Sequence, residues 1–131
     1  MTEIKLLTKI ALVVDAIIWI LFGTMFIFLY DMALNPEGWT NPYFPRMFGG
    51  VTYVSAIFAV LILRKKEWED IKMIFSYFIC IITSTLIIEI SVLSIFGSTF
   101  SASFILLGTS TIIIEVVLVV LGIVSYINQR R

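Results

Sequence analysis

One apolar stretch, from Met73 to Phe96, constrains this chain more than any other feature because it is long enough to cross a lipid bilayer. A membrane-spanning helix needs about 20 predominantly apolar residues. The stretch contains a single ionisable side chain, Glu89. A carboxylate exposed to lipid costs several kcal/mol, so we expect Glu89 to face other helices or a water-filled cavity.

Three other apolar stretches are similar, and together the four predict the fold class. Of the 131 residues, 60% are hydrophobic and 14% are charged, and the mean hydropathy is +1.08. Such a chain has too little polar surface to cover a water-soluble globule. We therefore expect an all-α integral membrane protein, with one domain over residues 1–131 folded as an antiparallel bundle of four transmembrane helices. The expected spans are about residues 10–30, 47–63, 73–96 and 104–127.

The basic residues predict how the four spans are oriented, because loops rich in lysine and arginine stay in the cytoplasm. Of the nine basic residues, eight fall on one side of the four-span arrangement and only Arg46 falls on the other. We therefore expect a multi-pass protein of the cell membrane with both termini in the cytoplasm. The loop at residues 31–45 and the turn at residues 97–103 are then outside. The eight residues are Lys5, Lys9, Arg64, Lys65, Lys66, Lys72, Arg130 and Arg131.

Three acidic side chains lie inside the expected spans and form the centre of a candidate site for a ligand or a proton. A helix rises about 1.5 Å per residue, so sequence position predicts depth. Glu89 lies about 10 Å and Glu115 about 16 Å from the outer edge, whereas Asp15 lies about 8 Å from the cytoplasmic edge. Glu115 is thus near the middle of the membrane. Acids at graded depths are typical of paths for protons or cations.

Helical spacing adds polar neighbours to the two glutamates, because residues three or four positions apart share a helix face. An arginine also belongs to the candidate site. Arg46 opens the second span at its outer end, and its long side chain has the reach to approach Glu89. We expect an ion pair between these two residues. The polar neighbours are Thr85 beside Glu89, and Thr111 and Tyr126 beside Glu115.

Two helix faces are expected to be buried. In the first span, Asp15 shares a stripe with Thr8, Ala11, Trp19, Phe22 and Phe26, and this face should point inward. In the second span, small residues recur every three or four positions, which allows another helix to approach closely. We expect that contact within the same chain rather than in a dimer. The ridge consists of Gly49, Thr52, Ala56 and Ala59.

Composition argues against several classes of function. Histidine is absent and Cys80 is the only cysteine, so one chain offers no imidazole or thiolate cage and no disulfide. We therefore expect no metal and no cofactor. The formal net charge is zero, which gives no reason to expect a nucleic-acid partner. No nucleophile with an adjacent base can be assembled, so we do not expect an enzyme.

A short motif suggests a family. The sequence Phe44-Pro45-Arg46-Met47-Phe48-Gly49-Gly50 places an arginine and paired glycines at the opening of the second span, after an outer loop that contains tryptophan and proline. Together with the four-span layout, this motif resembles small four-helix membrane proteins of the DoxX-like kind. The resemblance implies an accessory role beside redox or quinone-linked membrane enzymes rather than a catalytic one.

Two functions follow as hypotheses. The first is a non-enzymatic accessory subunit or interaction protein, whose partners are the lipid bilayer and other membrane subunits or a second copy of the chain. The alternative is a carrier linked to protons or cations, or a bundle that binds a small ligand. Both stay open because carboxyl groups within a membrane hold helices together as well as relay protons.

Overall fold

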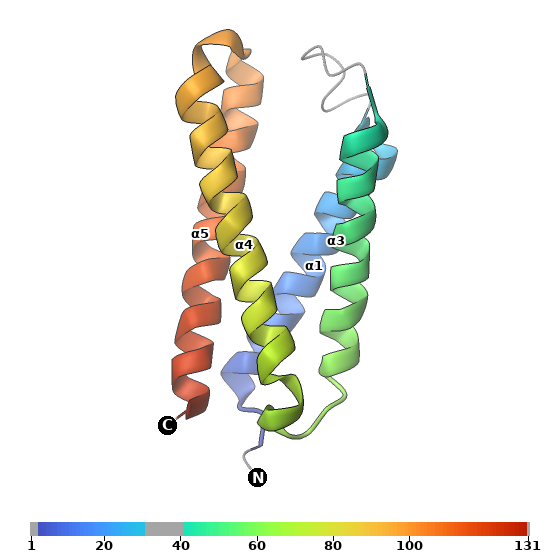
Figure 1. Cartoon of the computed structure of the whole chain (residues 1–131), viewed down its shortest axis with the longest axis vertical. Coiled ribbons are helices and arrows are strands. Elements are labelled where there is room, and N and C mark those ends of the chain that lie inside the picture. The colour runs from blue at the N-terminus through green and yellow to red at the C-terminus, as the bar shows by residue number, and fades with distance from the viewer. Residues whose placement is uncertain (1–2, 31–40, 131) are drawn as a thin grey trace. The chain divides into compact units, whose positions relative to one another are not determined.

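The computed structural model describes residues 3–30 and 41–130, and it is built from helices. Four of these helices are long and apolar enough to cross a membrane. This confirms the prediction of an all-α chain with four helices of membrane-spanning length. They are α1 (Leu6–Phe28), α3 (Tyr43–Ile62), α4 (Trp68–Phe96) and α5 (Ala102–Arg130), with a short 3-10 helix, η2 (Gly97–Thr99), between the last two (Figure 1).

The outer loop predicted at residues 31–45 lies outside the described residues for most of its length. Its described end, from Asn41, leads directly into α3, with Pro45 in the first turn. Proline is tolerated there because the first turn of a helix does not use its N–H groups.

The helices form two compact units, each with its own internal packing. One unit comprises Met1–Ala11 and Lys66–Arg131, and so includes the first residues of α1 together with α4 and α5. The other comprises Leu12–Lys65, and so includes the rest of α1 and all of α3. We call them the α4/α5 unit and the α1/α3 unit.

In the α1/α3 unit, small residues bring the two helices into close contact. A Cβ atom added to Gly49 would lie 2.7 Å from Ile27 Cγ1 and 3.2 Å from the carbonyl oxygen of Gly23. The hydroxyl groups of Thr24 and Tyr53 are hydrogen-bonded at 2.7 Å. The predicted small-residue ridge is buried along its whole length, which confirms that α3 uses this face for packing within the chain. The predicted inward stripe of α1 is buried from Thr8 through Asp15 to Trp19, whereas Phe22 and Phe26 at its far end are half-buried.

In the α4/α5 unit, two helices of 29 residues run side by side in opposite directions (Figure 1). Each is about 44 Å long at 1.5 Å per residue, so each exceeds the roughly 30 Å hydrocarbon core. After η2, the Ser101 hydroxyl accepts a hydrogen bond from the backbone N–H of Phe104 at 3.2 Å and caps the start of α5. The turn predicted at residues 97–103 is therefore a tight connection between two antiparallel helices.

Candidate functional site

A seam of buried residues joins α4 to α5 and contains two of the predicted acids. On α5 the buried positions follow a step of seven residues from Gly108 to Glu115 and then alternate between steps of three and four, which is the pattern of helices packed side by side. The same alternation on α4 continues from the buried residues to Thr85 and Glu89, which are partly buried. The buried residues of α4 are Trp68, Ile71, Phe75, Phe78 and Ile82, and those of α5 are Gly108, Glu115, Leu118, Gly122, Ser125 and Gln129.

Two glycines let α4 and α5 approach closely on either side of Glu115. A Cβ atom on Gly108 would lie 3.0 Å from Leu93 Cδ1, and one on Gly122 would lie 2.9 Å from Ile79 Cγ1. These contacts fix the antiparallel register, in which the stretch of α4 between Ile79 and Leu93 faces the stretch of α5 between Gly122 and Gly108. Glu115 lies in the middle of its stretch and therefore faces the turn of α4 that holds Thr85 and Glu89.

The carboxyl groups of Glu89 and Glu115 lie close to each other across the seam, and Oε2 of each is buried without a hydrogen-bond partner among the described residues. The hydroxyl of Thr85, one turn before Glu89, donates to the carbonyl oxygen of Ile82 on its own helix, at 2.9 Å. Glu115 is buried, with 9% of its surface exposed, and Glu89 is half-buried. We call Glu89 and Glu115 the carboxyl pair.

The buried oxygen atoms of the carboxyl pair lack a hydrogen-bond donor. An ionised carboxylate only accepts hydrogen bonds, so two carboxylates cannot bond to each other. Among the described residues, neither Oε2 of Glu89 nor Oε2 of Glu115 has a hydrogen-bond partner. A protonated carboxyl group gains an O–H and keeps acceptor capacity, so one proton on the pair would supply a donor for the other group.

The other predicted site residues lie apart from this pair. The Thr111 hydroxyl donates to the carbonyl oxygen of Leu107 on its own helix, at 3.0 Å. Tyr126 lies about three turns beyond Glu115 along α5. Its ring packs edge-on against Trp68, with the ring centroids 5.5 Å apart, and the guanidinium of Arg130 lies over it at 5.1 Å. Tyr126 thus belongs to the end of the seam rather than to the acids.

The two remaining site residues belong to the α1/α3 unit. Asp15 is buried and Arg46 is exposed. The predicted ion pair between Arg46 and Glu89 would join residues of different units, and it stays a prediction.

Sequence reasoning missed a polar cluster at the end of the seam, where the N-terminal segment meets α5. Gln129 has 2% of its surface exposed and uses both ends of its amide. Its Oε1 atom accepts from the backbone N–H of Lys5 at 2.8 Å and from the Thr8 hydroxyl at 3.2 Å, and its Nε2 atom donates to the carbonyl oxygen of Glu3 at 2.6 Å. We call this arrangement the Gln129 clasp.

Further bonds extend the clasp to the connection that precedes α4. The Ser125 hydroxyl donates to the carbonyl oxygen of Leu7 at 3.4 Å. The backbone N–H of Ile4 donates to the carbonyl oxygen of Lys66 at 3.0 Å, in a short antiparallel bridge. The N-terminal segment is therefore held between this connection and the end of α5.

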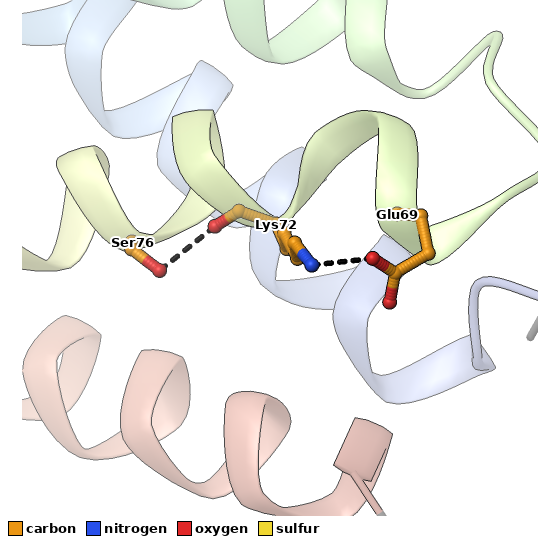
Figure 2. Close-up of polar contacts among 3 residues, drawn as sticks. All are labelled: Glu69, Lys72 and Ser76. Atoms are coloured by element: carbon orange, nitrogen blue, oxygen red, sulfur yellow. Dashed lines mark hydrogen bonds and ion pairs between the residues drawn. The ribbon is translucent and has the colours of Figure 1, made fainter.

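The first turns of α4 show how its charged residues are accommodated near the clasp. Lys72 forms an ion pair with Glu69 one turn earlier, and the Ser76 hydroxyl donates to the carbonyl oxygen of Lys72 at 2.8 Å (Figure 2). Both side chains of the ion pair are exposed, so this pair contributes little stability. The charges of Glu69 and Lys72 are compatible with a position at the water-exposed end of α4.

Comparisons of the chain with protein-family models, curated proteins and solved structures find no match.

Proposed function

We propose that this chain is a small, non-enzymatic, multi-pass membrane protein that works as a proton-linked carrier, with the carboxyl pair as its proton site. The observation that supports the proposal is the proximity of two buried carboxyl oxygens without hydrogen-bond partners, those of Glu89 and Glu115, on neighbouring helices that are long enough to span a membrane. Ionisable groups inside a membrane mark paths for ions or protons. A pair that shares a proton is able to gain and lose it without moving either helix.

The chemistry of the pair favours a proton over a metal cation. Calcium takes six to eight oxygen ligands and magnesium six, whereas the site brings together only the two carboxyl groups of Glu89 and Glu115. Within residues 3–30 and 41–130, no three histidine, cysteine, aspartate or glutamate side chains gather as they do around a metal. The proton is therefore the ion that this geometry fits.

We also propose that both termini lie in the cytoplasm. The Gln129 clasp supports this proposal because it bonds Glu3 to a residue near the end of α5. Two ends that are bonded to each other lie on the same side of the membrane, so the chain between them crosses the membrane an even number of times. The hydrogen bond from Ile4 to Lys66 likewise supports placing the connection before α4 on the same side of the membrane as the N-terminal segment, with an even number of spans between them. The excess of lysine and arginine on this side favours the cytoplasm.

The second candidate is an accessory subunit, in which the carboxyl pair only holds α4 against α5. The observation in its favour is the close packing at Gly108 and Gly122, which makes the seam around Glu115 a helix-packing surface. The resemblance to DoxX-like membrane proteins supports the same candidate, because it implies an accessory role. On this hypothesis the carboxyl pair keeps its proton permanently and transports nothing.

Proton flux into reconstituted vesicles separates the two candidates. Glu115→Gln keeps the shape and a hydrogen-bonding group at this position but removes titration, whereas Glu115→Leu removes both. A carrier predicts pH-driven flux above that of empty vesicles for the wild type, and loss of that flux in Glu115→Gln at unchanged thermal stability. Wild-type flux equal to that of empty vesicles, with stability lost only in Glu115→Leu, would instead support the accessory subunit.

A further inference from the structure

An apolar groove lies on the surface of the α1/α3 unit, between its two helices. Its volume is about 310 Å³, at the lower end of the range of about 300–1,000 Å³ for small-molecule sites, and it is open to the surroundings. The one hydroxyl group among its lining residues, that of Tyr53, is hydrogen-bonded to Thr24 at 2.7 Å. The groove therefore suits a narrow apolar group rather than a polar ligand. It is lined by Ile20 of α1 and by Tyr53, Ala56, Ile57, Val60 and Leu61 of α3.

The groove runs along α3 towards the end of the helix that basic residues follow. Arg64 comes three residues after Leu61 and four after Val60. The backbone N–H of Arg64 still donates to the carbonyl oxygen of Leu61 at 3.2 Å, so the chain keeps its helical course beyond Ile62. Residues three or four positions apart share a helix face. Arg64 therefore continues the stripe of α3 that lines the groove.

Arg64 and its neighbour Lys65 are available to bind an anion. Both side chains are exposed, and within residues 3–30 and 41–130 no carboxylate forms an ion pair with either of them. Lys72, by contrast, is paired with Glu69. The guanidinium group of an arginine presents its donors in a planar fork that matches the oxygen atoms of a phosphate. The end of the groove thus offers two unpaired cations to a phosphate group.

The length of the groove matches one leaflet of a membrane. Eleven residues separate Tyr53 from Arg64, which corresponds to about 16 Å along a helix. One leaflet contributes about half of a hydrocarbon core that is about 30 Å thick. An acyl chain that starts at the level of Arg64 therefore follows the groove to about the middle of the membrane.

We propose that this groove is a binding site for an anionic phospholipid, with its phosphate at Arg64 and Lys65 and one acyl chain along Val60 and Ile57. Charge complementarity selects the anionic headgroup, because a zwitterionic lipid carries a cation of its own that the two basic residues repel. The negative surface potential of the cytoplasmic leaflet comes from anionic lipids, and we have proposed that this end of α3 is cytoplasmic. The site shares no residue with the carboxyl pair, so it does not depend on the carrier proposal.

Native mass spectrometry of the full chain in detergent tests the headgroup. The protein is titrated with phosphatidylglycerol or with phosphatidylcholine that has the same acyl chains, so only the headgroup charge differs. We expect the wild type to prefer one phosphatidylglycerol, and Arg64→Gln to lower this preference about fivefold, as for the loss of one basic residue near anionic lipid. Lys72→Gln is the matched control. It removes the same charge from a residue that is already paired with Glu69, so the preference should not change.

A pair of valine variants tests the groove. Val60→Phe fills part of the groove and should remove the preference for one bound phosphatidylglycerol. Val54→Phe makes the same change at an exposed valine of α3 that does not line the groove, and it should bind as the wild type does. Both valines are exposed, so neither variant should lower the melting temperature.

Equal binding of the two lipids by the wild type would overturn the proposal, and so would equal effects of Arg64→Gln and Lys72→Gln. A melting temperature lowered by Val60→Phe but not by Val54→Phe would overturn it as well, because the chain itself would then fill the groove. A dimer that Val60→Phe dissociates would assign the groove to a second copy instead. None of these results affects the carrier proposal, which is decided by proton flux.

Discussion

Glu89 of α4 and Glu115 of α5 bring two carboxyl groups together in the seam that joins the two helices, and Oε2 of each is buried without a hydrogen-bond partner among the described residues. Two acids are poor partners as anions, but they are good partners when one of them is neutral. We therefore expect the pair to stabilise the contact between α4 and α5 when it holds a proton, and to weaken that contact when both groups are ionised. The stability of the contact between α4 and α5 is then linked to the protonation of Glu89 and Glu115.

This linkage predicts that the two glutamates are energetically coupled. Glu89→Leu or Glu115→Leu should each destabilise the detergent-solubilised protein by about 1–3 kcal/mol, because each leaves the other carboxyl buried without its partner. The double variant should lose less than the sum of the two, by at least about 0.5 kcal/mol. Chemical unfolding followed by circular dichroism measures the cycle. Strictly additive losses would mean that the two side chains do not interact.

The contact between α1 and α3 predicts that adjacent glycines differ in their tolerance of alanine. Gly49→Ala places a Cβ atom against Ile27 and against the backbone carbonyl of Gly23, which has little freedom to move. We expect a loss of about 1–3 kcal/mol in unfolding free energy, as for other overpacked sites. Gly50→Ala is the control, because no atom lies within 4 Å of its added Cβ. Equal stability of the two variants would contradict the packing of α3 against α1.

The Gln129 clasp predicts that an amide near the end of the chain is important for stability. Gln129→Leu removes three hydrogen bonds and leaves the buried backbone groups of Glu3 and Lys5 without this partner, which should cost about 2–4 kcal/mol. Asn128→Ala should cost much less, since the bond from Lys5 uses the backbone carbonyl of Asn128. Thermal unfolding of the two variants gives the comparison. A melting temperature lowered equally by both would argue against the clasp.

The proposed topology predicts the sides from which introduced cysteines are labelled. In a Cys80→Ala background, Ser98→Cys should react with a membrane-impermeant maleimide added to intact cells, because Ser98 lies in the exposed turn between α4 and α5. Glu69→Cys, at the other end of α4, should react only after the membrane is permeabilised. The reverse pattern would mean that the protein is inserted with the opposite orientation.

Much of the fold follows from the sequence because lipid imposes strong rules on long apolar stretches. The four stretches predict the four helices, and the spacing of Gly49, Thr52, Ala56 and Ala59 predicts the buried face of α3. Both predictions depend on one helix at a time. A helix in lipid must satisfy its own backbone groups, so its existence depends little on its neighbours.

Contacts between helices were harder to predict, and the carboxyl pair shows why. The sequence places Glu89 and Glu115 at depths that differ by about 6 Å, and a search for an opposite charge leads to Arg46. The packing at Gly108 and Gly122 instead places the turn of α4 that holds Glu89 opposite Glu115. A carboxyl group that keeps its proton is itself a hydrogen-bond donor, so the partner of an acid within a membrane need not be a base.

The Gln129 clasp was not predicted from the sequence, for a different reason. Gln129 lies near the end of the chain, among residues that resemble a solvated tail. A seven-residue repeat along α5 relates Gly108, Glu115, Gly122 and Gln129, and this repeat is the signal that assigns Gln129 to the buried seam. Its partners in the N-terminal segment are mainly backbone groups. Every residue has such groups, so the sequence of side chains does not show which of them bond to Gln129.

Infrared spectroscopy of the protein in lipid tests the shared proton most directly. The spectrum of the wild type, minus that of the double variant Glu89→Gln/Glu115→Gln, isolates the carboxyl pair from every other acid in the chain. We predict a stretching band of a protonated carboxyl group at neutral pH that shifts when water is replaced by D₂O, because the proton exchanges. A difference spectrum without that band, or a band unmoved by D₂O, would contradict an exchangeable proton held between Glu89 and Glu115.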